Sequence, residues 1–291
     1  MIKFLKENNI NFTKNFCLKN VTTIKGIERC KYYIEVDNYY QLYNLLDYIK
    51  LYNLKYLIIG NGSKVVFINN YKGIIISLKK LNKIYKNIDT YEVDAGVLLP
   101  NLINYIKKDN YGGIEELIGI PCSIGGGLVN NVSAHNVELS KFLIKVMVYE
   151  DNKIKELNKN NIIFSYRNSS LKNKIILKAY FKFVNKDKEI IENKIKEYKE
   201  YRKNNQVISL PNIGSIFKNI NDIKAYKIIK DCNLENIKFK NISLCKKHLN
   251  FLEIKGTCKG KNVYKFIKKI QKKVYFLKKI KLKTEIIFIK S

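Results

Sequence analysis

The chain has no tryptophan and only three prolines and two histidines among its 291 residues. It also has few acidic residues, 25 compared with 55 basic ones. Its six cysteines form no C-x-x-C pair, and His135 and His248 stand far from any metal-ligand spacing, so neither a zinc site nor a disulfide framework is indicated. No run of 18 or more apolar residues lacks a charge, and the first residues leave no room for a signal peptide's apolar core. We therefore expect a soluble cytoplasmic protein with no metal and no membrane partner.

The formal net charge of +30 invites a nucleic-acid partner, because a basic surface attracts polyanions. The lysines, however, are spread along the whole chain, and no RNP, helix-turn-helix or zinc-finger pattern accompanies them. Lys, Asn, Ile and Tyr are all over-used, which is what an AT-biased coding sequence produces. We therefore expect no nucleic-acid partner.

Hydrophobic residues make up 46% of the chain, enough for one large or two modest domains. Apolar spacing predicts helices and strands in mixed order, which favours an α+β fold over a doubly wound sheet. The charged helix predicted from residue 187 is the best candidate for a boundary, so we expect domains at 1–186 and 187–291. The predicted helices cover 42–49, 98–106, 187–205, 225–232 and 263–274. The predicted strands cover 56–59, 65–68, 74–76, 143–149, 175–184 and 286–289.

Two glycine-rich loops stand out in this glycine-poor chain. The run from Ile118 to Gly127 contains a proline followed by three consecutive glycines, and Gly60-Asn61-Gly62-Ser63 follows a predicted strand. Glycine permits positive φ and close approach of the main chain, so these loops are either tight turns or sites where amide groups bind an anion such as phosphate. The loop Gly60–Ser63, the first of the two along the chain, lacks the third glycine of a Rossmann fingerprint and leads into β-branched residues, so any dinucleotide would bind differently.

Three further motifs carry polar groups between apolar segments. Arg167 lies in Phe164–Ser170, where its guanidinium could clamp a carboxylate, although an ordinary surface arginine is the simpler interpretation. Ser215 lies in the loop Pro211–Asn219, which contains a proline and a glycine and presents the hydroxyl group. An ordinary turn is the simpler interpretation of this loop. Glu285 interrupts the apolar C-terminal strand, so its carboxylate either faces outward or lies in a cleft.

In this order the motifs resemble those of the bacterial UDP-N-acetylenolpyruvoylglucosamine reductase family, also called UDP-N-acetylmuramate dehydrogenases, which are flavoenzymes of peptidoglycan precursor synthesis. The family pattern runs G-x-G-S, G-I-P-G-T-x-G-G with M-N-A-G-A-Y-G, Y-R-x-S, G-S-x-F-K-N, S-x-K-H-x-N-F and a final acidic strand. It is met from about Thr22 to Glu285. The separation of 48 positions between Arg167 and Ser215 resembles the family's shorter type, without the inserted tyrosine loop.

The resemblance implies an FAD-binding domain of the vanillyl-alcohol-oxidase (PCMH) type, followed by a smaller α+β substrate-binding domain. It also implies FAD as cofactor, NADPH as hydride donor, and reduction of the enolpyruvyl group of UDP-N-acetylglucosamine-enolpyruvate to UDP-N-acetylmuramate. The positions that match the family's cofactor-binding residues are Gly60, Asn61, Gly62, Ser63, Gly119, Ile120, Pro121, Ser123, Gly125, Gly126 and Asn131.

The resemblance also assigns the chemistry. Arg167 and Glu285 match residues that stabilise the negative charge formed when hydride reaches the enolpyruvyl group, and Ser215 matches the proton donor. Tyr166, Lys218 and Asn219 match substrate-binding positions, and we expect a monomer.

The chain departs from the family pattern at several positions. Cys122 stands where the family has glycine, Asn131–Asn136 replaces N-A-G-A-Y-G, and Ile220 replaces a proline. Two alternatives therefore stay open, which are an FAD-dependent oxidase of the same superfamily and a basic binding protein that has lost catalysis.

Overall fold

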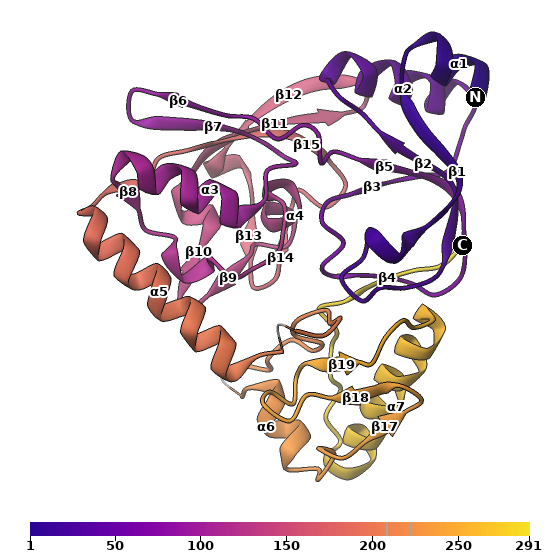
Figure 1. The fold of residues 1–291 in the computed structure, drawn as a ribbon, viewed down its shortest axis with the longest axis vertical. Helices are drawn as coiled ribbons and strands as arrows, with labels where there is room; N and C mark the ends of the chain where they lie inside the picture. Colours follow the sequence, from indigo (N-terminus) through magenta and orange to yellow (C-terminus); the bar gives the residue numbers. More distant parts are fainter. Residues whose placement is uncertain (208, 222) are drawn as a thin grey trace. The chain divides into compact units, whose positions relative to one another are not determined.

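The computed structural model describes residues 1–207, 209–221 and 223–291, which form two compact units (Figure 1). Neither unit is continuous in sequence, whereas the predicted division at residues 186/187 cuts the chain once and stays a prediction about domains. Unit 1 comprises Met1–Thr13, Tyr33–Asn61 and Ile74–Glu200. Unit 2 comprises Lys14–Tyr32, Gly62–Gly73 and Tyr201–Ser291.

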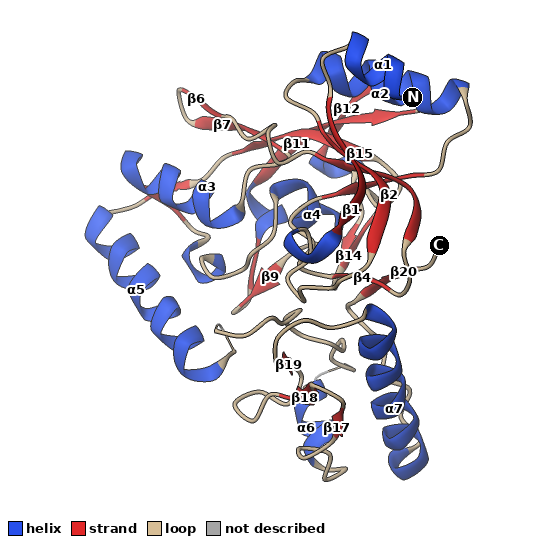
Figure 2. Ribbon diagram, turned by 45° about the vertical axis from the view of Figure 1, so that its right-hand side comes forward, coloured by secondary structure: helices blue, strands red, loops and turns tan. Residues whose placement is uncertain are grey.

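Helices and strands are mixed along the chain, with runs of consecutive strands such as β3 to β7 (residues 56–94), and Figure 2 distinguishes them by colour. The α-helices are α1 (Ile2–Glu7), α2 (Tyr39–Leu51), α3 (Leu99–Ile106), α4 (Ile124–Val129), α5 (Lys188–Asn205), α6 (Ala225–Lys230) and α7 (Gly260–Lys278). The 3-10 helices are η1 (Leu18–Asn20), η2 (Lys107–Asp109), η3 (Glu115–Leu117), η4 (Leu139–Phe142) and η5 (Lys159–Asn161). The first strands are β1 (Asn11–Cys17), β2 (Arg29–Glu35), β3 (Tyr56–Ile59), β4 (Val65–Phe67), β5 (Tyr71–Ser77), β6 (Ile84–Asn87), β7 (Thr90–Asp94), β8 (Tyr111–Gly112), β9 (Ser133–Ala134) and β10 (Val137–Glu138). The others are β11 (Leu143–Glu150), β12 (Lys153–Asn158), β13 (Phe164–Ser165), β14 (Asn168–Ser169), β15 (Ile175–Phe181), β16 (Val184–Asn185), β17 (Lys238–Phe239), β18 (Ile242–Leu244), β19 (Leu252–Ile254) and β20 (Ile287–Ile289).

Unit 1 contains an antiparallel sheet with the strand order β12-β11-β15-β7-β6. Across its middle, Ala179 of β15 pairs with Val146 of β11 on one side and with Val93 of β7 on the other. All three side chains are fully buried, and residues directly opposite each other on neighbouring strands point to the same face. The sheet therefore has one face packed on the core of the unit.

Helices of unit 1 follow the predicted periodicity. In α2 the buried residues include Leu42, Leu45, Leu46 and Ile49, as predicted, and the helix begins where the Asn38 side chain accepts a hydrogen bond from the Gln41 amide at 2.9 Å. In α3 the residues at the predicted spacing, from Leu102 to Ile106, are likewise buried. Both helix predictions are confirmed.

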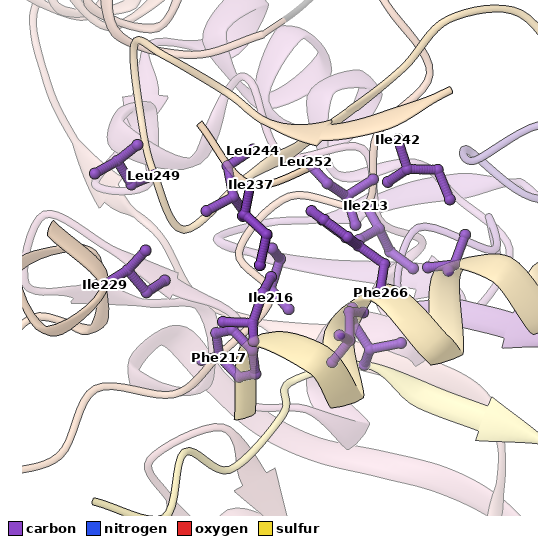
Figure 3. Close-up of a cluster of buried hydrophobic side chains, with 14 of the residues drawn as sticks. Ile213, Ile216, Phe217, Ile229, Ile237, Ile242, Leu244, Leu249, Leu252 and Phe266 are labelled. Carbon is purple, nitrogen blue, oxygen red and sulfur yellow. The ribbon is translucent and has the colours of Figure 1, made fainter. Parts of the chain in front are cut away.

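Unit 2 has its own hydrophobic core, part of which Figure 3 shows. The long helix α7 contributes the predicted stripe of apolar residues, including Phe266 and Ile270, which are fully buried. Ile216 and Phe217, the neighbours of Ser215, are also fully buried in this core. Because its neighbours are anchored, the main chain at Ser215 has a fixed position.

The parallel pairing of β20 with β4 closes unit 2. Ile287 pairs with Val65 and Ile289 with Phe67, and the Ile287 amide donates to the Lys64 carbonyl at 2.8 Å. This register places Glu285, just before β20, close to the chain that leaves the first glycine loop. In the described part of the chain, no helix is long and apolar enough to cross a membrane.

Candidate active site

Within unit 1 the two glycine-rich loops lie against each other. A Cβ added to Gly60 would meet the Ser123 Oγ at 2.3 Å, so only glycine fits there. The Asn61 side chain donates a hydrogen bond to the Pro121 carbonyl at 2.9 Å. The structure therefore brings together the predicted cofactor residues Gly60, Asn61, Pro121 and Ser123.

The three consecutive glycines do not use the positive φ that glycine permits. They lie in the helix α4, and the described glycines with positive φ are Gly62, Gly113, Gly214 and Gly256. Close packing explains them instead, because a Cβ on Gly125 would meet the Ala95 Cβ at 3.1 Å. Gly126 and Gly127 donate their amides to Ser123, so the run is a capped helix and not a nest of free amides.

Main-chain donors for an anion are instead present in the first loop. Within the described residues, the amides of Gly60 and Asn61 donate no hydrogen bond to another protein group. Gly62, in unit 2, has a φ of 63° and a Cβ there would meet the Val21 carbonyl at 2.0 Å, so this turn also requires glycine. A loop whose main-chain donors have no protein acceptor fits the phosphate of a dinucleotide.

The remaining predicted cofactor residues mostly have protein partners. The buried Asn131 amide donates to Glu138 Oε2 and to the Ser165 carbonyl, and it accepts a hydrogen bond from Ser140 Oγ at 2.7 Å. Ile120 takes part in main-chain hydrogen bonds with Leu117 and Cys122. Contacts from any of the predicted cofactor residues to FAD, including Asn131, Gly119, Ile120 and Ser63, stay predictions.

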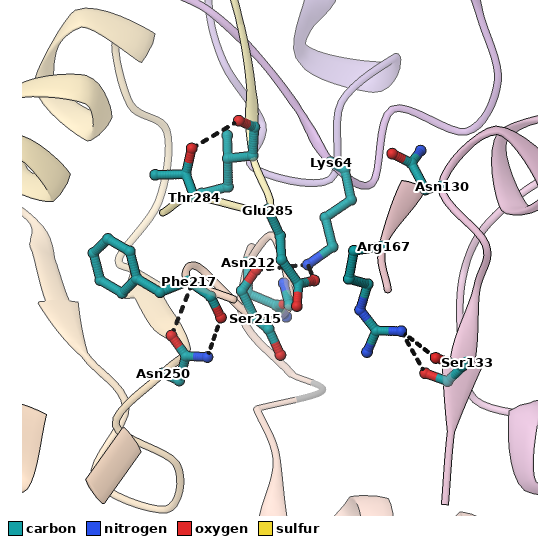
Figure 4. A network of polar contacts seen from close by, with 12 residues as sticks. Lys64, Asn130, Ser133, Arg167, Asn212, Ser215, Phe217, Asn250, Thr284 and Glu285 are labelled. Carbon is teal, nitrogen blue, oxygen red and sulfur yellow. Dashed lines mark hydrogen bonds and ion pairs between the residues drawn. The ribbon is translucent and has the colours of Figure 1, made fainter. Parts of the chain in front are cut away.

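Arg167 lies in a two-residue turn between β13 and β14, with a φ of 54°. Its Nη1 donates to the carbonyl and to the Oγ of Ser133, as Figure 4 shows. Its guanidinium carbon lies 5.3 Å from the centre of the half-exposed Tyr166 ring, a cation–π distance. The guanidinium is therefore oriented within unit 1 by Ser133.

Ser133 belongs to the segment that departs from the family pattern. His135 and Asn136 form the turn between β9 and β10, and both have left-handed φ values, 50° and 65°. Asparagine tolerates this region, and the His135 ring lies 4.8 Å from that of Tyr198. The hairpin thus keeps a conformation typical of glycine at positions that have none.

Ser215 and Glu285 come together in unit 2. The Glu285 amide donates to the Ile216 carbonyl at 2.8 Å, and Phe217 bridges to Thr284. The Glu285 side chain is 6% exposed, so the outward-facing position left open by the sequence is excluded. Gly214, with a φ of 66°, makes the turn that presents Ser215.

Sequence reasoning missed Lys64, which contacts both of these segments. Its Nζ donates to the Ser215 carbonyl at 2.6 Å and lies 3.0 Å from Glu285 Oε2 (Figure 4). The available signal was its position directly after the loop Gly60–Ser63. Sequence reasoning also missed Asn250, although its motif, S-x-K-H-x-N-F, was recognised.

The predicted substrate residues follow Ser215 closely in sequence. The Lys218 amide donates to the Lys283 carbonyl, and the Asn219 Oδ1 accepts from the Ala225 amide at the start of α6, at 3.0 Å. Asn219 therefore helps begin that helix. Substrate contacts from Tyr166, Lys218 and Asn219 stay predictions.

Cys122, where the family has glycine, has a thiol of low reactivity. Burial raises the pKa of its thiol to about 12, so the thiol is protonated at neutral pH. A protonated thiol is a weak nucleophile. Its Sγ packs on Gly127, at 3.3 Å from where a Cβ would lie.

Comparison with protein families gives two matches. Residues 30–152 match the FAD binding domain, and residues 205–289 match the UDP-N-acetylenolpyruvoylglucosamine reductase, C-terminal domain. Together they confirm the predicted FAD-binding domain and the α+β class.

Curated relatives match along nearly the whole chain. The UDP-N-acetylenolpyruvoylglucosamine reductase of Aquifex aeolicus is 32% identical over 286 residues, which is 96% of each chain. That of Carboxydothermus hydrogenoformans is 34% identical, over 94% of this chain and 92% of the relative. A solved structure of the Thermus caldophilus enzyme of the same name matches with a TM-score of 0.81 at 22% identity, over 96% of this chain and 98% of that one, and so supports the fold.

Proposed function

This chain belongs to the UDP-N-acetylenolpyruvoylglucosamine reductase family, and from that premise we propose that it reduces UDP-N-acetylglucosamine-enolpyruvate to UDP-N-acetylmuramate for peptidoglycan precursor synthesis. NADPH is the hydride donor and FAD the cofactor. The observation that carries the proposal is the arrangement in unit 2, where Glu285 is buried beside the anchored loop of Ser215. We further propose that the protein acts as a monomer in the cytoplasm.

The amides of Gly60 and Asn61 would hold the cofactor's phosphates, because they are donors without protein acceptors in the described residues. When bound there, FAD would supply the chemistry that carries hydride between NADPH and the substrate. The glycine at position 60 keeps this loop against Ser123, so a larger residue would displace the donors. Asn61 fixes the same loop to Pro121.

Reduction of the enolpyruvyl double bond adds a hydride to one carbon and a proton to the other. Negative charge develops on the carbon next to the carboxylate between these two events. A guanidinium matches a carboxylate geometrically and stays charged, so Arg167 would pair with that group. Oriented groups of this kind are worth about 3 kcal/mol each in water-poor sites.

Ser215 would supply the proton. An alcohol is a weak acid in water, so this role requires a hydroxyl held in a fixed place. The buried neighbours Ile216 and Phe217 provide that rigidity. Tyr166, Lys218 and Asn219 would contact other parts of the substrate.

Spectroscopy and turnover test the proposal together. The purified protein should have flavin absorbance bands near about 370 and 450 nm, as flavoproteins do. It should oxidise NADPH steadily when the enolpyruvyl sugar is present. NADPH consumption that depends on O2 alone would support an oxidase, and a colourless protein without turnover would support a binding protein that has lost catalysis.

A further inference from the structure

Lys64 links the two segments of unit 2 that carry Ser215 and Glu285. Its ammonium donates to the Ser215 carbonyl at 2.6 Å and pairs with Glu285 Oε2 at 3.0 Å. Its own carbonyl accepts a hydrogen bond from the Ile287 amide at 2.8 Å. Figure 4 shows the lysine side chain extending toward both partners. Lys64 therefore contacts the loop of Ser215 through its side chain and the strand after Glu285 through its main chain.

A glycine makes the turn that brings the Ser215 carbonyl to this ammonium. Gly214 has a φ of 66°, which disfavours any residue with a side chain. A Cβ there would lie 3.4 Å from the Lys64 Nζ, an ordinary van der Waals contact, so the backbone conformation and not a lack of space favours glycine at 214.

Burial makes the ion pair important for the Glu285 side chain. That side chain is 6% exposed and that of Lys64 is 28% exposed, so both charges are largely removed from water. A buried carboxylate without a partner is destabilised by several kcal/mol, and a nearby cation offsets this. The pair also matters electrostatically, because a lone carboxylate would repel the negative charge that develops on the substrate, whereas a carboxylate paired with an ammonium has no net charge.

We propose that Lys64 is a positioning residue of the reductive chemistry, which neutralises Glu285 and holds it in register with the Ser215 loop. The inference rests on the proposed function, since it assigns Lys64 to the step in which the enolpyruvyl group is reduced. Lys64 acts through Glu285 and the Ser215 main chain and not on the substrate itself.

Reduction by NADPH and reoxidation by the enolpyruvyl sugar can be measured as separate half-reactions. The comparison distinguishes a loss of positioning by Lys64 from a loss of cofactor. In anaerobic stopped flow, Lys64→Met should be reduced by NADPH at nearly the parental rate, but its reoxidation by the enolpyruvyl sugar should slow about 100-fold, the scale of a misplaced catalytic group. Lys64→Arg, which keeps the charge, should recover part of that loss. The control Lys283→Met removes an exposed lysine near Glu285 and should reoxidise at the parental rate.

A double-mutant cycle tests whether Lys64 acts through Glu285. If it does, the loss in Lys64→Met/Glu285→Gln should be smaller than the product of the two single losses, because the carboxylate that Lys64 neutralises is already absent and only its contact with the Ser215 carbonyl is left to lose. Losses that multiply in the double variant would overturn the proposal, as would a Lys64→Met variant that raises KM with kcat unchanged. The Arg variant and this cycle remain decisive even if Lys64→Met has a lower unfolding temperature.

A different measurement, reoxidation of the parent protein, distinguishes failure of the proposed function from failure of the inference on Lys64. If the parent protein never reoxidises with the enolpyruvyl sugar, the proposed function is wrong. If the parent reoxidises and Lys64→Met does so equally fast, the proposed function stands and the inference on Lys64 is wrong.

Discussion

The side chain of Asn250 forms a two-way hydrogen-bond pair with the main chain of Phe217, accepting from its amide at 2.9 Å and donating to its carbonyl at 2.8 Å (Figure 4). Both residues are buried, and Asn250 also accepts a main-chain hydrogen bond from Ile216 through its carbonyl, at 2.8 Å. Asn250 therefore replaces a neighbouring strand for the segment that follows Ser215. This explains why an asparagine stands in the motif that ends at Phe251.

We expect Asn250→Ala to destabilise the protein by about 2–4 kcal/mol, because it leaves a buried donor and a buried acceptor of Phe217 without partners. Urea unfolding of parent and variant measures the difference. The matched control is Asn241→Ala, whose amide donates to the carbonyls of Lys255 and Thr257 at the surface. Equal losses in the two variants would mean that burial of the Phe217 pair has no special importance.

Arg167→Ala should slow reoxidation of the reduced flavin by the enolpyruvyl sugar at least about 100-fold, because a charge-stabilising donor is lost. Reduction by NADPH should remain close to the parental rate. Arg29→Ala is a suitable control, since the Arg29 Nε also bonds the carbonyl and side chain of one residue, Asn15, but at the surface. Slow reduction with normal reoxidation would reverse the assignment of Arg167.

Ser215→Ala should bind the UDP-sugar nearly as well as the parent and lose most turnover, because the lost interaction belongs to the transition state. Ser215→Cys should recover part of the rate, since a thiol is a better acid than an alcohol. Stopped-flow reoxidation in D2O with NMR of the product measures both. A change in KM alone would make Ser215 a binding residue.

Glu28 should make the stability of the protein depend on pH. Burial raises the pKa of its carboxyl above 4.5, although its Oε1 accepts a hydrogen bond from the Gly260 amide at 2.7 Å. Between 4.5 and the raised value, the folded state holds more protons than the unfolded state, so this contribution to stability is present at low pH and is lost as the pH rises through that window.

Glu28→Gln keeps an acceptor for Gly260 and removes the titration. We therefore expect the variant to gain stability relative to the parent as the pH rises from 4 to 7, measured by urea unfolding at about four pH values. Parallel stability curves for the two proteins would contradict the assignment.

The raised pKa of Cys122 also makes a prediction about the flavin. A protonated thiol does not attack the isoalloxazine, so FAD should be bound without a covalent bond to this residue. After acid precipitation the yellow colour should stay in the supernatant. Colour in the pellet that disappears in Cys122→Ala would show a covalent link.

Much of the local structure was predictable from the sequence. Periodic apolar residues located α2, α3 and the buried stripe of α7, because an apolar face repeats with the period of the element. The helix α4 was missed because three consecutive glycines disfavour a helix. The glycines are needed for close packing, such as that of Gly125 on Ala95, and a tertiary contact of this kind is not visible in the local sequence.

The candidate site was predictable only in part, for the same reason. The order of motifs pointed to Ser215 and Glu285. The position of Lys64 after a glycine loop does not tell which residues it contacts, because Ser215 and Glu285 lie far along the chain. The same applies to the partnership of Asn250 with Phe217. Contacts between remote segments depend on the fold, and periodicity does not report them.

The pairing of β20 with β4 limits how this protein can be divided for experiments. The matched C-terminal family segment, 205–289, contains β20 but not β4, and it also lacks the stretch 14–32 that belongs to the same compact unit. A fragment cut at that boundary would leave one side of β20 without its partner strand, and unpaired strand edges invite aggregation. A recombinant form of unit 2 would need a circular permutation or a fusion that supplies Gly62–Gly73. Truncation at the family boundary is therefore the wrong starting point for isolating this unit.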